Sequence, residues 1–357
     1  MEVQKKTTPA VFNVKEFGAV GNGKTDDTAA FQAALDAARP HEGMVTVPAG
    51  QYCIRSVRVY EGTALCGEGL HGAKDGGSSL LYCGDGTDKG CLDISDAYGC
   101  VIHGLNLEGQ HRGKSVCGIY LERKGTGKNV EDTSHIENCR VADFSGDGLH
   151  YNGMWCDSVR HCLFEDNGRF GIFVSGWDVF FFDNIFRRNR AAGLGCLDNA
   201  FNSVTAQNNR FTENGGPGMQ FKGASMATFM GNTFENNAGP GVEIGDRGQV
   251  TNSFLMTGNT FLGNAREGKN EYSTQLYADF THNFLINGNT FLPGADGFAP
   301  DYCITVKRLW STQICNNTMS GAMKKAAFCD LGAKNGYVTV CDNVGTPVTA
   351  LPLSFDE

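Results

Sequence analysis

Three acidic residues in the second half of the chain have types and spacing suited to acid–base chemistry. Glu243 and Asp246 are three residues apart, and Asp279 follows further along the sequence. Two carboxyl groups about 5 to 9.5 Å apart can cleave or transfer a glycosidic bond. One protonates the leaving oxygen, and the other attacks the anomeric carbon or activates water. These residues can meet only if repeated elements bring distant parts of the chain together.

Such elements are present, because the chain repeats a short N-x-F unit from about residue 100 onward. Successive units are 22 to 30 residues apart, and most are followed by a second alternating segment that begins with glycine. This period, without helical or leucine-rich spacing, predicts a right-handed parallel β-helix with glycine and asparagine at its corners. The aligned asparagines are expected to bond one another in a ladder. The units begin at Cys139, Cys162, Asn184, Asn209, Asn232, Asn259, Asn289, Asn317 and Asn343.

The composition favours one long coil over two globular domains. The 357 residues include 48 glycines but only 9 prolines; 41% are apolar and 19% charged, which excludes collagen and disorder. No apolar run is long enough to span a membrane, and the formal net charge of −9 argues against nucleic-acid binding. We expect a single all-β domain, 1–357, of about 10 to 12 coils. Its parts are a cap segment (12–54), the coils (55–345) and a C-terminal tail (346–357).

The cap segment is expected to contain one amphipathic helix, residues 26–38, lying as a lid across the first coil. Thr25 or Asp26 is placed to cap this helix, and Asp27 favours its positive end. Asp26 and Asp27 are therefore interpreted as capping rather than catalytic residues. The apolar face of the helix consists of Ala30, Phe31, Ala34, Leu35 and Ala38.

The cap segment also carries a family resemblance. The stretch F-G-A-x-G-N-G-x-T-D-D-T, followed by V-x-V-P-A-G-x-Y, resembles the N-terminal signature of the pectate lyase-like single-stranded right-handed β-helix superfamily. That superfamily includes polysaccharide lyases, glycoside hydrolases, mannuronan epimerases, fructan-cyclising fructotransferases and phage tailspikes. The resemblance implies an oligo- or polysaccharide ligand without fixing the reaction. It also implies a homotrimer as one expected assembly.

Alternation within the second segment of each unit predicts two outward rows of side chains on neighbouring coils. The first row is Tyr120, His150, Phe173, Gly195, Gln220, Glu243, Tyr277 and Thr305. The second row is Glu122, Asn152, Ser175, Leu197, Lys222, Gly245, Asp279 and Lys307. We predict Glu243 as the central catalytic residue, with Asp279 or Asp246 as its partner. The predicted sugar-binding residues are His150, Gln220, Lys222, Tyr277, Lys307, Trp155 and Trp177.

Three functions stay open at this point. The first is a glycoside hydrolase or glycosyl-transferring enzyme of the fructan or difructose anhydride type. The second is a uronate lyase or C5-epimerase, with His150 or Tyr277 as base and Lys222, Lys307 and Arg308 neutralising the carboxylate. The third is a non-catalytic, tailspike-like glycan-binding scaffold. The D-P-H-E motif of mannuronan epimerases and the N-T-D, G-H-G and R-I-K motifs of polygalacturonases are absent. No aspartate cluster resembles a calcium site, so we expect no metal and no cofactor.

The 14 cysteines show no zinc-like CxxC pairs, and several fall in apolar-alternating segments, as buried reduced thiols would. The first ten residues lack a signal-peptide pattern, so we expect a cytoplasmic protein, or a secreted one if a signal was trimmed. Insertions at 123–135, 263–273 and 292–302 account for most of the excess coil length. They are expected to gather beside the binding face.

Overall fold

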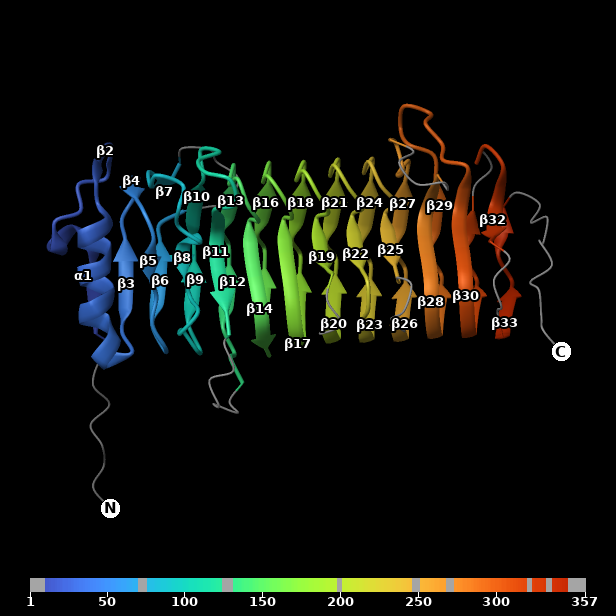
Figure 1. Cartoon of the computed structure of the whole chain (residues 1–357), viewed down its shortest axis with the longest axis horizontal. Helices are drawn as coiled ribbons and strands as arrows, with labels where there is room; N and C mark the ends of the chain where they lie inside the picture. The colour runs from blue at the N-terminus through green and yellow to red at the C-terminus, as the bar shows by residue number, and fades with distance from the viewer. Residues whose placement is uncertain are drawn as a thin grey trace, which may run out of the picture.

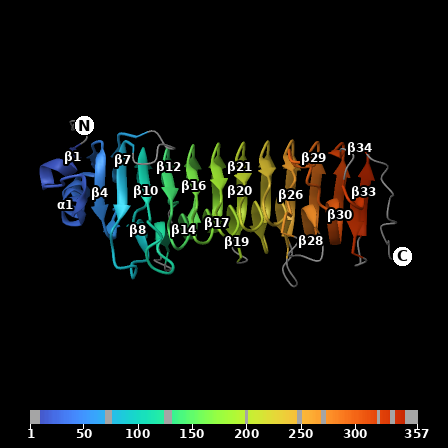
Figure 2. The ribbon, with the colours of Figure 1, turned by 90° about the horizontal axis from the view of Figure 1, so that it is seen from above.

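The computed structural model describes residues 10–69, 76–123, 131–197, 201–245, 251–267, 273–319, 323–331 and 336–345. They form a parallel β-solenoid of about 11 turns with one short helix near the N-terminus (Figure 1). The predicted β-helix is confirmed. Seen from above, the coils follow one another in chain order from α1 to β33 (Figure 2).

The larger sheet has 21 strands and contains two consecutive sides of each coil. Several of its strands are long enough to bend from one side to the next. The strands are β1 (Val11–Asn13), β3 (Met44–Val47), β5 (Val57–Arg58), β6 (Ala64–Gly67), β8 (Gly90–Asp93), β9 (Val101–His103), β11 (Cys117–Glu122), β12 (His135–Glu137), β14 (Leu149–Trp155), β15 (Ser158–Arg160), β17 (Ile172–Phe182), β19 (Leu194–Cys196), β20 (Phe201–Gln207), β22 (Met219–Phe221), β23 (Ser225–Met230), β25 (Val242–Ile244), β26 (Thr251–Thr257), β28 (Thr274–Asn287), β30 (Tyr302–Cys315), β32 (Ala326–Asp330) and β33 (Gly336–Cys341).

The smaller sheet has 13 strands and forms the remaining side of each coil. The N-x-F units of the sequence lead into its strands. They are β2 (Asn22–Asp26), β4 (Gly50–Ile54), β7 (Ser78–Tyr82), β10 (Leu105–Glu108), β13 (Arg140–Ala142), β16 (Leu163–Glu165), β18 (Ile185–Arg187), β21 (Arg210–Thr212), β24 (Thr233–Glu235), β27 (Thr260–Leu262), β29 (Thr290–Leu292), β31 (Thr318–Met319) and β34 (Val344–Gly345).

The predicted asparagine ladder runs along the corner before the smaller sheet. The side-chain amide of Asn209 donates to Asn232 Oδ1 at 3.0 Å, and Asn232 donates to Asn259 Oδ1 at 3.0 Å. The same oxygens accept backbone N–H groups of the preceding coil. The ladder therefore satisfies buried backbone groups at each corner. Its rungs are Asn184, Asn209, Asn232, Asn259, Asn289, Asn317 and Asn343.

A second ladder, not predicted from the sequence, runs along the corner after the smaller sheet. It includes Asn189 and Asn214 and ends where Asn264 donates to Gln275 Oε1 at 2.8 Å. Between the two ladders, phenylalanine rings stack from coil to coil with centroids 4.6 to 5.4 Å apart. The stacked rings are Phe164, Phe186, Phe211, Phe234, Phe261 and Phe291.

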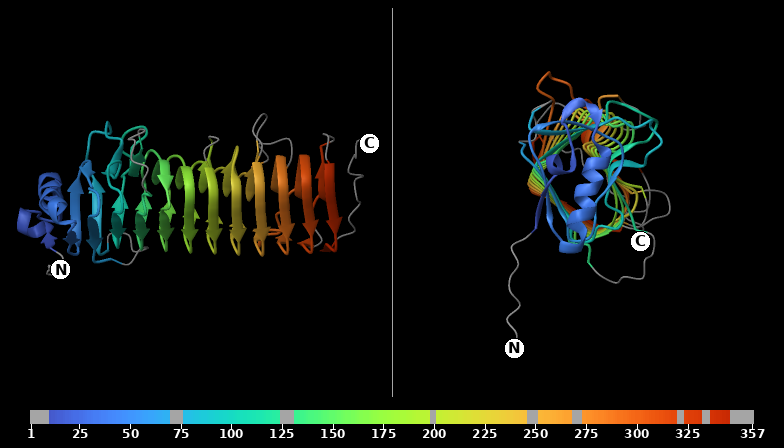
Figure 3. Two further views of the ribbon diagram at one scale, coloured as in Figure 1. Left: turned by 90° about the horizontal axis from the view of Figure 1, so that it is seen from below. Right: turned by 90° about the vertical axis from the view of Figure 1, so that its left-hand side faces the viewer.

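Helix α1 (Thr28–Ala38) lies across the open N-terminal end of the solenoid, as predicted (Figure 3). Its apolar face is buried, and the Phe31 ring meets the Tyr52 ring edge-on at 5.2 Å. The helix begins two residues later than predicted. Its N-cap residue is Asp27, which makes no side-chain capping hydrogen bond, while Asp26 accepts from the Thr28 backbone N–H at 3.0 Å. Asp27 accepts from Val20 and Gly21 instead, so its carboxylate fixes the preceding loop.

Short 3-10 turns, Val14–Phe17 and Arg39–His41, flank this part of the chain. Among the residues described, no helix is both long and apolar enough to cross a membrane. All 14 cysteines lie in the described ranges and are free thiols, ten of them buried.

Candidate active site

The register of the strands confirms the first outward row. Tyr120 pairs with His150, His150 with Phe173, and Gln220 with Glu243, each one coil apart. The rest of the row follows the same pairing through Tyr277 to Thr305. A single continuous face therefore carries these side chains at steps of about 4.8 Å.

His150 is held tightly within this row. Its imidazole stacks on the Tyr120 ring at 5.2 Å and on the Phe173 ring at 5.1 Å, with interplanar angles of 6° and 10°. About a fifth of the side chain stays exposed. Two flanking rings fix the plane of the imidazole, while its edge remains open to a ligand.

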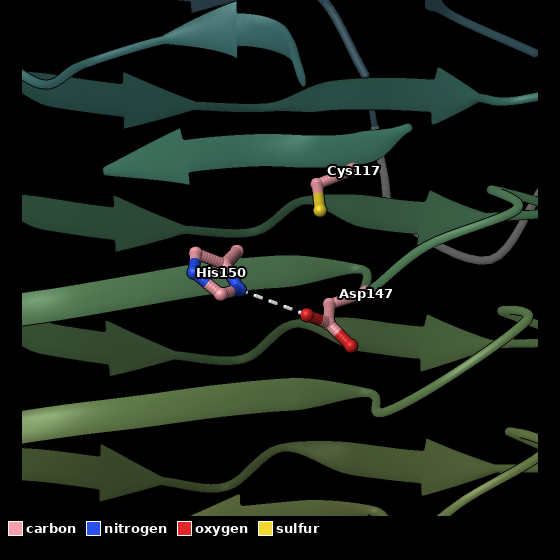
Figure 4. Close-up of side chains that lie close together, drawn as sticks. All are labelled: Cys117, Asp147 and His150. Carbon is pink, nitrogen blue, oxygen red and sulfur yellow. Dashed lines mark hydrogen bonds and ion pairs between the residues drawn. The ribbon is translucent and has the colours of Figure 1, made fainter. Parts of the chain in front are cut away.

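Asp147 supports this histidine from below (Figure 4). Its fully buried carboxylate lies 2.9 Å from His150 Nδ1 through Oδ2. The other oxygen accepts the Phe170 backbone N–H at 3.0 Å. An ionised carboxylate only accepts, so Nδ1 is the nitrogen that donates to Asp147, and Nε2 is the nitrogen left to exchange a proton with a ligand.

A glycine fixes the start of the strand that aims His150. A Cβ added at Gly148 would lie 2.7 Å from the Gly171 carbonyl oxygen. The two coils can approach this closely only because no side chain stands there. Asp147, on the corner just before, is thereby directed towards the imidazole of His150, three residues further along the same coil.

A second hydrogen-bonded group lies on the other side of Tyr120. The Tyr120 hydroxyl donates to Glu122 Oε2 at 2.6 Å, and Lys89 Nζ contacts both groups at 3.2 and 3.0 Å. Burial and the hydrogen bond to Glu122 raise the pKa of Tyr120, so the phenol keeps its proton at neutral pH. Arg169 supplies another cation, with Nε 3.6 Å from Asp147 Oδ1.

Cys117 completes a cluster with Asp147 and His150, whose ligand atoms all lie within 4.8 Å of one another (Figure 4). Burial, and next the charge of Asp147, raise the pKa of the Cys117 thiol to about 12. The thiol is therefore protonated at neutral pH, whereas metals bind thiolates. Asp147 already accepts from His150. The donor set fits proton transfer better than metal binding.

Glu243 lies on the same face, four coils from His150. Gln220 Nε2 donates to Glu243 Oε1 at 3.2 Å, and Tyr277 is the register partner on the next coil. Both predicted neighbours of Glu243 are thus beside it. Asp246, the predicted second acid, lies outside the described residues.

Asp279 is not an open carboxylate. Arg308 holds it with two hydrogen bonds, 2.7 and 2.6 Å long, and only 6% of the Asp279 side chain is exposed. This geometry gives Asp279 a structural ion pair instead of the predicted acid–base role. The predicted cations Lys222 and Lys307 are half-buried, and Lys307 is the register partner of Asp279.

The two predicted sugar-binding tryptophans lie one coil apart, as register partners at the bend of the larger sheet. Trp155 Nε1 donates to Asp178 Oδ2 at 3.0 Å, whereas Trp177 is 46% exposed. They occupy the end of β14 and the middle of β17, beyond the strand segments that carry His150 and Phe173. The insertions 263–273 and 292–302 begin at the ends of β27 and β29 on adjacent coils, and residues 268–272 of the first lie outside the described residues.

Sequence reasoning found His150 but missed the residues around it: Asp147, Lys89 and Arg169. One signal was available for Asp147. Asp147 lies two residues before the inward residue Leu149. In the next four coils the residue at the corresponding position is apolar, so a charged residue at this position is unusual. These apolar residues are Phe170, Ala192, Pro217 and Pro240.

Comparison with known proteins identifies the family. The family model described as right handed beta helix region matches residues 90–291 and 197–345. The chain belongs to this β-helix family. A second model, described as rhamnogalacturonase A/epimerase, pectate lyase-like, matches residues 11–80. The superfamily resemblance of the cap segment is thereby confirmed.

Curated relatives of this β-helix protein include enzymes of Azotobacter vinelandii. Mannuronan C5-epimerase AlgE1 is 32% identical over 199 residues, which are 51% of this chain and 14% of AlgE1. Mannuronan C5-epimerase AlgE4 is 31% identical over 192 residues, 50% of this chain and 34% of AlgE4. Alginate lyase 7 is 28% identical over 216 residues, 55% of this chain and 24% of the lyase. The matched segment thus spans a third or less of each relative.

Solved structures share the coil architecture over nearly the whole chain. The A-module of mannuronan C-5 epimerase AlgE6 from Azotobacter vinelandii has a TM-score of 0.78 at 19% identity, covering 94% of this chain and 99% of the module. DFA-IIIase from Arthrobacter chlorophenolicus A6, without its lid, has a TM-score of 0.68 at 14% identity, covering 95% of this chain and 100% of that one. At these identities the likeness concerns the fold.

Proposed function

We propose that this β-helix protein removes the C5 proton of a uronate residue in a polysaccharide, as a C5-epimerase or a lyase does. The observation that carries the proposal is the imidazole of His150, oriented by a fully buried carboxylate and held between two aromatic rings. A histidine with one nitrogen bonded to a carboxylate and the other open has the form of a general base.

The surrounding groups match the needs of this reaction. When His150 Nε2 takes the C5 proton, the electron pair of the C–H bond moves towards the C6 carboxylate. Lys89 and Arg169 are placed to stabilise that growing charge. Tyr120 keeps its proton and lies against the imidazole, so it can act as the acid.

Two outcomes follow from the same intermediate. If water delivers a proton to C5 from the face opposite His150, the sugar is epimerised and no bond of the chain breaks. If the bond between C4 and the glycosidic oxygen breaks instead, the electrons form a C4–C5 double bond and the oxygen takes the proton. The relatives named as mannuronan C5-epimerases and as an alginate lyase support this pair of reactions over others.

A second candidate function, glycosidic bond hydrolysis or transfer, rests on Glu243. Its hydrogen bond with Gln220 and the adjacent Tyr277 are typical of a sugar-binding carboxylate. The fold shared with DFA-IIIase is compatible with it. Hydrolysis needs a second carboxyl group, and the predicted partner Asp279 is held by two hydrogen bonds from Arg308, which weakens this candidate function.

One experiment separates the two. The protein is incubated in D2O with polymannuronate, polyguluronate or polygalacturonate, and deuterium at C5 is measured by NMR. The epimerase introduces deuterium at C5, whereas the lyase leaves C5 without hydrogen and gives the ultraviolet absorbance of an unsaturated product, so either signal reports removal of the C5 proton. His150→Gln, which retains a hydrogen-bonding side chain but no base, should lower the rate about 10²- to 10⁴-fold.

The matched variant is Glu243→Gln, on the same row of the same sheet. It should keep at least half of the wild-type exchange rate if His150 is the base. Full exchange in His150→Gln would overturn the proposal. Hydrolysis of neutral oligosaccharides that is lost only in Glu243→Gln would establish the second function, and no turnover of any glycan would favour a non-catalytic scaffold.

A further inference from the structure

Two outward rows on the larger sheet beyond its bend contain no charged residue over seven consecutive coils. Strands β17, β20, β23, β26, β28, β30 and β33 lie side by side there (Figure 1). On each strand two outward residues flank one inward residue, and six of the seven inward residues are buried. We call the fourteen outward residues, two from each strand, the uncharged face. Its rows are Phe180, Thr205, Thr228, Leu255, Leu285, Gln313 and Thr339, and Phe182, Gln207, Met230, Thr257, Asn287, Cys315 and Cys341.

The smaller sheet provides a comparison within the same molecule. Two outward rows of equal length on β13, β16, β18, β21, β24, β27 and β29 contain five charged residues among fourteen. Both sheets face outward from the same coils and have the same strand spacing. The absence of charge is therefore a property of one face and not of the solenoid. The five charged residues are Arg140, Glu165, Arg187, Arg210 and Glu235.

Large apolar side chains are exposed on and beside the uncharged face. Phe180 is 36% exposed and Met230 38% exposed. Met226, whose backbone lies in the left-handed region (φ 53°), is nearer the bend on β23 and is 60% exposed. Trp177 and Trp310, in the next row, are 46% and 47% exposed. Exposed phenylalanine, methionine and tryptophan are typical of an interface core, and the Arg160 guanidinium, 5.6 Å from the Phe182 ring centroid, borders the face at its first coil.

We propose that the uncharged face is the interface of a homodimer, in which it packs against the same face of a second copy. Two identical faces related by a twofold axis form an isologous contact, and sheets pack in this way in β-sandwiches. Seven strands and three rows give a footprint of about 600 Å². A specific interface buries about 600 to 1,000 Å² on each partner, so the face is large enough.

The chemistry of the face favours a second copy over a sugar chain. A polyuronate carries one negative charge on each residue, and the two rows offer it no cation. Threonine, glutamine and asparagine side chains can both donate and accept, so they can pair with themselves across a twofold axis. The dimer is independent of the proposed function, since His150 lies on the other side of the bend.

Sedimentation velocity over about 1 to 100 µM protein tests the dimer, because its population depends on concentration. We expect the mass to rise from 38.4 kDa towards twice that value. Thr228→Arg, at the centre of the face, should remain monomeric at every concentration. Thr260→Arg places the same change on the smaller sheet and should behave as wild type.

Salt adds a second readout. Each copy carries a net charge of −9, so screening should strengthen the contact as sodium chloride increases. Methionine oxidation provides a third, since Met226 and Met230 should become protected at high concentration. Met44, 37% exposed but on β3 outside the seven strands, serves as the unprotected control.

Three results would overturn the proposal. One is a wild-type protein that stays monomeric throughout the range. Another is a dimer, or a trimer, that survives Thr228→Arg. The last is a monomer whose Met226 and Met230 become protected only when a neutral polysaccharide is added, which would make the face a glycan-binding surface.

Discussion

The buried carboxyl group of Asp157 makes the stability of the coils depend on pH in a way that can be calculated. This residue lies at the bend between β14 and β15 with no exposed surface. Ser134 N–H donates to Oδ1 at 2.6 Å, and Oδ2 has no partner among the described residues. Burial, and then the charge of Asp132, raise the pKa of Asp157 to about 8.

The sign follows from the two pKa values. In the folded protein Asp157 binds its proton up to about pH 8, while in the unfolded chain it loses the proton near pH 3.8. Between these values the folded state holds one proton more, so stability falls as pH rises, by about 1.4 kcal/mol per pH unit. From pH 5 to pH 7 the loss is about 3 kcal/mol.

Asp157→Asn removes the titration and keeps the shape of the side chain. Relative to wild type, the free energy of unfolding of this variant should increase by about 3 kcal/mol between pH 5 and pH 7. Denaturant unfolding at several pH values measures this difference. A difference for Asp157→Asn that does not change with pH would refute the reasoning.

Three further predictions concern the ladder, the ion pair and the site. Asn232→Ala removes four side-chain hydrogen bonds and should destabilise the fold by about 4 kcal/mol, whereas Thr233→Ala beside it should have a small effect in the same denaturation assay. Arg308→Ala leaves Asp279 buried without its cation, at a cost of about 3 to 5 kcal/mol, and adding Asp279→Asn should recover most of that loss. Asp147→Asn should lower the rate of C5 deuterium exchange about 10²-fold or more while circular dichroism stays unchanged.

The fold could be predicted from the sequence because its determinants repeat. Each N-x-F unit and each glycine at a corner recurs in register, and the two outward rows follow from alternation alone. The N-terminal helix was also predictable, since its apolar spacing is local. The second ladder was missed because its members are followed by variable residues instead of a fixed motif.

The site could be predicted only in part, because side-chain direction at bends does not follow alternation. The backbone of Arg308 lies in the left-handed region at φ 51°, which breaks the alternation of β30. Asp279 therefore bonds Arg308 and not its register partner Lys307. Asp147 likewise lies on a corner, where the sequence does not show whether a carboxylate turns inward, outward or towards a histidine.

The asparagine ladder has a consequence for how such a protein can change its length. The side chain of each rung bonds groups of the coil before and of the coil after it, so every interior coil presents the same set of contacts to its neighbours. Duplication of a whole coil in the gene would insert a new rung between two old ones without altering either partner. The binding surface could then lengthen one coil at a time, whereas an insertion of half a coil would break both ladders at once.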